Sequence, residues 1–120
     1  MPGTRKRILY VKDNADFRDM IRLLLKQEGH EIVTASSVAD ALELAETRQF
    51  DLYILDNWFE QGSGLDLCRQ IRRFDSQTPI FFCSGVGQES EIQEALASGA
   101  QAYLVKPTNF DRLLQLIAAL

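Results

Sequence analysis

The sequence has few cysteines and no long apolar run, and each of these absences removes a class of protein. Its 120 residues include only two cysteines, Cys68 and Cys83, without C-x-x-C spacing, so neither a disulfide framework nor a zinc site is indicated. No apolar run reaches the roughly 18 residues of a membrane helix, and residues 1–7 lack the apolar stretch of a secretion signal. We therefore expect a cytoplasmic protein with two buried free thiols.

Positive charge is also scarce. Thirteen Lys and Arg stand against seventeen Asp and Glu, a formal charge of -4, and no basic stripe of the kind that reads nucleic acid is present. Neither G-x-G-x-x-G nor G-K-[ST] occurs, which argues against a dinucleotide site or a P-loop. A chain with 46% hydrophobic and 25% charged residues is typical of a globular protein. We expect one domain over residues 1–120 that binds neither nucleic acid nor membrane.

Short apolar segments alternate with helical patterns along the whole chain. Strands are predicted at residues 7–11, 31–35, 52–55, 80–83 and 102–105. Two of the helices between them begin with an S-x-x-D capping pattern, at Ser37 and Ser63. Gly29 and Gly99 are expected to end two helices in the left-handed conformation, and residues 57–64 are expected to form a loop.

Five strand and helix units imply a parallel sheet, because neighbouring strands that run in the same direction need crossover helices. The expected fold is doubly wound α/β, flavodoxin-like, with a five-stranded parallel sheet in the order 2-1-3-4-5. In such sheets ligands bind beyond the carboxyl ends of the strands, at the switch point between the first and third strands. That point holds Asp13 and Asp56 in this chain.

Polar residues at this edge of the sheet form a candidate site. Besides Asp13 and Asp56, Ser84 follows the fourth strand and Lys106 the fifth. Two neighbouring carboxylates repel each other, so either one is protonated or a cation lies between them. Mg²⁺ suits two carboxylates and the backbone carbonyl of Trp58. Taken singly, Asp13 could be only a helix cap, Ser84 a loop hydroxyl and Lys106 a surface lysine, whereas their joint placement favours a site.

With these residues in view, the chain resembles the CheY-like receiver domains of bacterial two-component response regulators. The similarity covers about residues 5–120 and rests on I-L-Y-V-K-D-N at 8–14, D-L-Y-I-L-D-N at 51–57, G-S-G-L-D-L-C at 62–68 and G-A-Q-A-Y-L-V-K-P at 99–107. The resemblance implies a (βα)5 fold and phosphorylation-dependent signalling with Mg²⁺. The phosphoryl donor would be a histidine kinase or a phosphotransfer protein. The domain would be no enzyme beyond catalysing its own phosphorylation and dephosphorylation.

The resemblance also implies a role for each site residue. Asp56 would be the phosphoacceptor, Asp13 a magnesium ligand, Ser84 the hydroxyl that meets the phosphoryl group, and Lys106 its cationic partner, aimed by a cis peptide bond at Pro107. A carboxylate nucleophile attacking phosphorus forms an acyl phosphate. Cations then neutralise the equatorial oxygens of an in-line transfer, where positioning and electrostatics supply most of the catalysis.

Tyr103 is the expected switch residue. In the family, the matching aromatic side chain changes rotamer as the hydroxyl of Ser84 moves toward the phosphoryl group. This remodels the surface formed by the fourth helix, the fifth strand and the last helix, which we expect to bind a downstream protein or a second copy of the chain. The alternative is that Tyr103 is a half-buried core residue with a satisfied hydroxyl.

Lys12 departs from the family pattern, which has two acidic residues in a row after the first strand. The replacement changes the local charge by two units, and unit charges ~4 Å apart interact by about 4 kcal/mol at an effective dielectric of 20. A lysine that points inward would therefore weaken Mg²⁺ binding. We expect the side chain to swing into solvent on its flexible stem. Otherwise it pairs with Asp56 or Asp13 and takes the place of the ion.

Two other functions compete with phosphorylation-dependent signalling. Pairing of Lys12 with an acid would favour a pseudo-receiver, a protein-interaction domain that is not phosphorylated. An aspartate-nucleophile phosphatase is disfavoured, because the second acid of its D-x-D motif is Trp58 here. The sequence identifies neither the kinase nor the output, and it does not say whether the chain comes from a larger regulator or a hybrid kinase.

Overall fold

The computed structural model describes residues 5–13, 15–59, 62–84, 88–105 and 110–120. Its elements are β1 (Arg7–Val11), α1 (Ala15–Gln27), β2 (Glu31–Ala35), α2 (Val38–Thr47), β3 (Leu52–Leu55), β4 (Trp58–Phe59), β5 (Gly62–Ser63), α3 (Gly64–Arg72), β6 (Ile80–Ser84), α4 (Glu89–Ala97), β7 (Ala102–Val105) and α5 (Phe110–Ala118). Strands and helices alternate, as the sequence predicts. In the part of the chain that is described, no helix is both long and apolar enough to cross a membrane.

The main sheet is parallel and has the strand order β2-β1-β3-β6-β7. Counted within this sheet alone, the order is 2-1-3-4-5, which confirms the predicted topology. The labels run further because β4 and β5 form a separate antiparallel hairpin. That hairpin occupies residues that the sequence analysis expects to be a loop. The expectation is wrong there because Trp58 and Phe59, two aromatic strand formers, pair with Ser63 and Gly62, and Gly62 adopts a φ of 119°.

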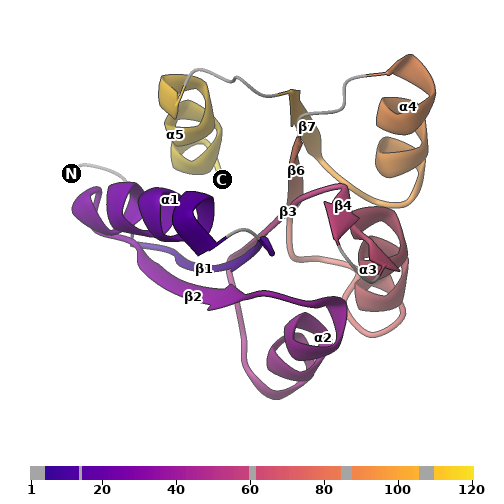
Figure 1. The fold of residues 1–120 in the computed structure, drawn as a ribbon, viewed down its shortest axis with the longest axis horizontal. Coiled ribbons are helices and arrows are strands. Elements are labelled where there is room, and N and C mark those ends of the chain that lie inside the picture. The colour runs from indigo at the N-terminus through magenta and orange to yellow at the C-terminus, as the bar shows by residue number, and fades with distance from the viewer. Residues whose placement is uncertain (1–4, 14, 60–61, 85–87, 106–109) are drawn as a thin grey trace.

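Helices cover both faces of the sheet (Figure 1). Helices α1 and α5 pack on one face, and α2, α3 and α4 pack on the other. All four residues of β3 are buried, as expected for a central strand covered on both faces. The carboxyl ends of β1, β3 and β6 therefore meet at one edge, between the two helical layers.

The predicted helix ends are confirmed where the structure describes them. The hydroxyls of Ser37 and Ser63 accept backbone N–H bonds from Asp40 and Asp66 at 3.2 and 3.1 Å. Gly29 and Gly99 have φ values of 91° and 113°. Both cysteines are buried, and neither forms a disulfide. Two further residues of the kind that cap helices, Asn14 and Thr108, lie outside the described residues.

Candidate functional site

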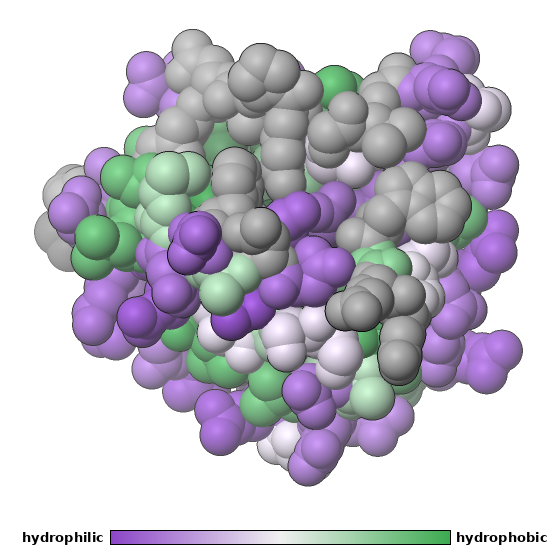
Figure 2. All heavy atoms as spheres, in the orientation of Figure 1, coloured by the Kyte–Doolittle hydropathy of each residue, from purple (hydrophilic) through white to green (hydrophobic). Residues whose placement is uncertain are grey.

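The register of the sheet brings Lys12 and Asp56 side by side. Val11 pairs with Leu55 between β1 and β3, so the next residue of each strand lies at the carboxyl edge. The backbone N–H of Asp56 donates to the carbonyl of Val11 at 3.3 Å, and Asp56 is only 4% exposed. Hydrophilic side chains gather near the centre of the surface in Figure 2, over the end of β1.

The ammonium of Lys12 forms an ion pair with the carboxylate of Asp56. Lys12 Nζ donates to Asp56 Oδ2, and the two side chains are only 16% and 6% exposed. The expectation that Lys12 turns into solvent is therefore wrong. The nearly buried carboxylate of Asp56 loses hydration energy, and the neighbouring ammonium offsets part of that loss. If Lys12 faced solvent, the loss would remain without compensation.

The oxygen ligands at this edge are of the type that binds Mg²⁺, but there are few of them. Asp13 and Asp56 follow adjacent strands, and carboxylate and carbonyl oxygens are ligands that Mg²⁺ prefers. Asp13 is exposed. Within the described ranges, no group of three or more His, Cys, Asp or Glu lies together in a way that could hold a metal. Lys12 stands in place of a further acid at this edge, and its ammonium is ion-paired with Asp56.

A polar network lies on the other side of Asp56. Ser84 is 1% exposed at the end of β6. The buried amide of Asn57 donates to Glu91 Oε2 of α4 at 2.9 Å and to the hydroxyl of Tyr103 at 3.2 Å. Burial raises the pKa of Tyr103, while hydrogen bonds with Ser84 and Asn57 oppose that rise. The network connects β3, β6 and β7 with the first turn of α4.

The position of Tyr103 is compatible with both predictions made for it, a switch residue and a half-buried core residue. It is partly buried, and its ring stacks on Phe82 with centroids 5.5 Å apart and planes 7° from parallel. Its hydroxyl meets Asn57 and Ser84. Asn57 and Glu91 were not singled out from the sequence. The position of Asn57 directly after Asp56 was the one available signal.

Gly64 allows α3 to begin directly behind the strand that carries Asp56. A Cβ atom on Gly64 would lie 1.9 Å from the backbone carbonyl oxygen of Asp56. The N–H of Gly64 also donates to the carbonyl of Asn57 at 2.8 Å. Only glycine permits this approach without a backbone shift. The close contact with Gly64 therefore helps to fix the position of Asp56.

Three predicted site residues are tested little or not at all. Lys106 and Pro107 lie outside the described residues, so the cationic partner and the cis peptide bond stay predictions. Trp58 pairs with Ser63 in the hairpin, and the role of its carbonyl as a magnesium ligand stays a prediction too.

A buried hydroxyl of β1 is the second unusual feature near Asp56. Among the described residues, Tyr10 carries the one buried side-chain oxygen or nitrogen that lacks a hydrogen-bond partner. Burial is the main reason that the pKa of Tyr10 is raised, and Cys83 and Asp56 raise it further, while Arg18 lowers it. The hydroxyl therefore stays protonated and acts as a neutral group beneath the site.

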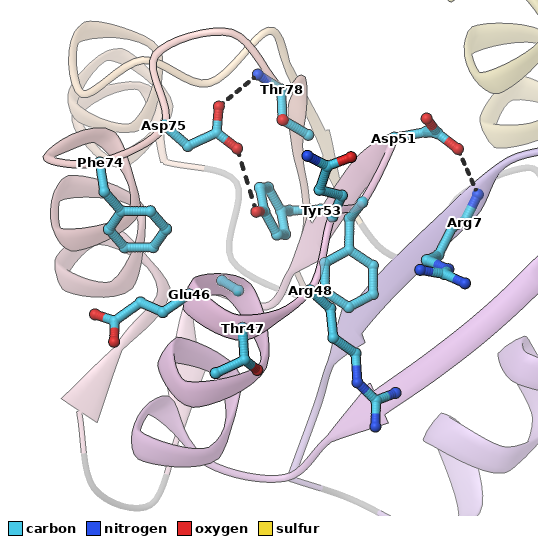
Figure 3. A pocket seen from close by; sticks show the side chains of 12 residues that line it. Arg7, Glu46, Thr47, Arg48, Asp51, Tyr53, Phe74, Asp75 and Thr78 are labelled. Carbon is cyan, nitrogen blue, oxygen red and sulfur yellow. Dashed lines mark hydrogen bonds between the residues drawn. The ribbon is translucent and has the colours of Figure 1, made fainter.

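A groove lies at the opposite edge of the sheet, and several of its lining residues hydrogen-bond with one another (Figure 3). It lies beside the amino ends of β1 and β3. The hydroxyl of Tyr53 and the N–H of Thr78 both donate to the carboxylate of Asp75, at 3.3 and 3.0 Å. The N–H of Arg7 donates to Asp51 at 2.7 Å. These hydrogen bonds hold part of the groove's lining, at the edge of the sheet opposite Asp56.

The comparisons agree with this geometry. The response regulator receiver domain family matches residues 8–118, and the chain belongs to that family. It is 36% identical over 112 residues to chemotaxis protein CheY of Bacillus subtilis strain 168, which covers 92% of this chain and 93% of that protein. The crystal structure of a two-component response regulator from Clostridium difficile superposes with a TM-score of 0.91 at 27% identity, covering 96% of this chain and 94% of that chain.

A longer relative shows a different coverage. The chain is 36% identical over 125 residues to a probable transcriptional regulatory protein of a Picosynechococcus species, covering 98% of this chain but 50% of that protein. The chain therefore spans most of the length of one relative and half of the length of the other. The family and the CheY-like fold are common to both kinds of match.

Proposed function

We propose that this receiver domain accepts a phosphoryl group on Asp56 from a histidine kinase or a phosphotransfer protein, with Mg²⁺ as the cofactor. The observation that carries the proposal is the place of Asp56. It ends the central strand, at the switch point of the sheet, with cationic Lys12 on one side and the Asn57, Ser84 and Tyr103 network on the other.

The chemistry is a group transfer between two nucleophiles. A carboxylate oxygen of Asp56 attacks phosphorus, the bond from phosphorus to the donor breaks, and the donor leaves with that electron pair. The product is an acyl phosphate. Positive charge beside the carboxylate stabilises the equatorial oxygens during the transfer. Mg²⁺ and Lys106 are proposed to supply these charges.

The magnesium ligands are proposed to be Asp13, Asp56 and the backbone carbonyl of Trp58. When bound, the ion would neutralise charge on the phosphoryl oxygens. Asp56 would therefore act both as the nucleophile and as a magnesium ligand. Both roles use the carboxylate that is ion-paired with Lys12.

The switch is proposed to run through the network around Tyr103. Ser84 turning toward a new phosphoryl group would break its hydrogen bond with Tyr103. Because Asn57 joins Tyr103 to Glu91, the change would reach the first turn of α4. We propose that the face formed by α4, β7 and α5 binds a downstream protein or a second copy of the chain. The domain would act in the cytoplasm and catalyse only its own phosphorylation and dephosphorylation.

Acetyl phosphate and intact-mass spectrometry test the acceptor. Incubation with acetyl phosphate and MgCl₂ should add one phosphoryl group to the wild-type chain and none to Asp56→Asn. The exposed Asp66 provides the control, and Asp66→Asn should give the same adduct as wild type. An adduct that survives in Asp56→Asn would exclude Asp56 as the acceptor. The absence of any adduct from the wild type would favour the pseudo-receiver hypothesis.

Tyr103→Phe tests the switch. The substitution keeps the ring that stacks on Phe82 and removes the hydroxyl that meets Asn57 and Ser84. We expect adduct formation on Asp56 to be unchanged, while the phosphorylation-induced amide shifts of α4 in ¹⁵N spectra are lost. If α4 in the phosphorylated Tyr103→Phe variant shifts as in wild type, the switch assignment is wrong.

A further inference from the structure

Both oxygens of the Asp56 carboxylate accept hydrogen bonds. Oδ1 accepts from the backbone N–H of Asn57 at 2.7 Å, and Oδ2 accepts from the ammonium of Lys12. We propose that Lys12 is a built-in competitor of the divalent cation, which binds Asp56 only when the ammonium leaves Oδ2. The choice of Mg²⁺ as that cation rests on the proposed function.

The backbone of Lys12 is fixed, so the competition depends on its side chain. The N–H of Lys12 donates to the carbonyl of Ala35 in β2 at 3.0 Å. Its carbonyl accepts from Arg18 Nη1 of α1 at 2.9 Å. Since both backbone groups are held, displacement of the ammonium must come from rotation about the side-chain bonds. Lysine has the long flexible stem that this movement requires.

The hydrogen bond from Asn57 to Asp56 is harder to break. The N–H of Asn57 belongs to the peptide that follows Asp56, and the carbonyl of Asn57 accepts from Gly64 at 2.8 Å. The Asn57 side chain is tied to Glu91. Oδ1 is thus held by the fold, whereas Oδ2 is held by a side chain that can move. Because a divalent cation beside Asp56 also repels the ammonium, we expect Lys12, and not the N–H of Asn57, to be the donor that it displaces.

Charge at this edge sets the direction of the effect. Asp13, Asp56 and Lys12 together carry a formal charge of about -1, which becomes about -2 with a neutral residue at position 12 and about -3 with an acid there. Because both paired side chains are largely excluded from solvent, these charges interact more strongly than they would in water. A neutral residue at position 12 should therefore strengthen cation binding, and an acidic residue should strengthen it further.

Isothermal titration with MgCl₂ tests this series. Lys12→Met should lower the dissociation constant at least about tenfold, and Lys12→Asp should lower it further. The control is Lys26→Asp, which changes the net charge equally at an exposed position of α1 and should stay within about twofold of wild type. A Lys12→Met value within twofold of wild type would overturn the proposal. So would an equal gain in Lys26→Asp.

A measurement on the wild type needs no substitution. Acetylation of amines followed by peptide mass spectrometry should find Lys12 protected in metal-free protein and reactive at saturating MgCl₂, while Lys26 is equally reactive in both. Equal protection of Lys12 in both conditions would overturn the proposal.

The two proposals fail separately. A graded Mg²⁺ affinity without a phosphoryl adduct on Asp56 would reject only the proposed function. An adduct on Asp56 with the same Mg²⁺ affinity in wild type, Lys12→Met and Lys12→Asp would reject only the competition by Lys12.

Discussion

The ion pair between Lys12 and Asp56 should contribute measurably to the stability of the fold. The perturbation is a double-mutant cycle with Lys12→Met, Asp56→Asn and the two combined. Methionine keeps most of the lysine stem, and asparagine keeps the shape of the aspartate. Each single change therefore removes one charge and leaves the other at a nearly buried position.

The magnitude follows from what each remaining charge can do. Removing one partner of a buried ion pair typically costs about 3–5 kcal/mol. In Lys12→Met the carboxylate stays at the end of a fixed strand but keeps its bond from Asn57, so we expect a loss of about 2–3 kcal/mol. In Asp56→Asn the freed lysine can rotate toward solvent, which reduces the loss to about 1 kcal/mol.

The double variant leaves no unpaired charge at this position and should unfold with a free energy within about 1 kcal/mol of wild type. The coupling energy between the two positions should thus be about 2–4 kcal/mol. Urea unfolding at neutral pH without divalent cations measures it, and Lys12→Met should move the midpoint by about 1–2 M. A coupling energy below about 0.5 kcal/mol would refute the reasoning, because it would mean that the pair is not formed in solution.

Urea unfolding also measures three further changes. Gly64→Ala should lose about 1–3 kcal/mol, because the new Cβ meets the backbone of Asp56, and a neutral result would contradict the close approach. Tyr10→Phe should gain about 1 kcal/mol by removing an unpaired buried hydroxyl, and a loss would reveal a partner. Burial raises the pKa of Asp75, but hydrogen bonds led by Thr78 outweigh it and hold this pKa below its ordinary value. The resulting stability is present above that value and lost as pH falls below it, so Asp75→Asn should lose about 1 kcal/mol at neutral pH and show a flatter acid limb.

The fold was predictable because its signals are local and repeat. The run at residues 52–55 is apolar without interruption, which predicts a strand covered on both faces, and the structure buries all of it. Ser37 and Ser63 mark helix starts through a bond that spans three residues. Once the strands are known, crossover rules fix the sheet, and the sheet fixes the edge at which Asp56 lies.

The details of the site were less predictable because they depend on contacts between distant residues. The bond from Asn57 to Glu91 spans 34 residues, and nothing in the local sequence of either residue indicates it. The direction of the Lys12 side chain depends on Asp56, 44 residues away. A flexible side chain can face solvent or a charge, and a general preference of lysine for water says nothing about a carboxylate that the fold brings beside it.

Consecutive residues of the central strand's end therefore face two different sets of partners. Asp56 pairs with Lys12 of the β1 end, and Asn57 binds Tyr103 of β7 and Glu91 of α4. The bond from the Asn57 N–H to Asp56 Oδ1 connects the two sets. Charge on the carboxylate strengthens that bond, so neutralising Asp56, by protonation or by forming the proposed acyl phosphate, should weaken both this bond and the ion pair with Lys12. One chemical event at Asp56 thus acts on the cation side and on α4 together.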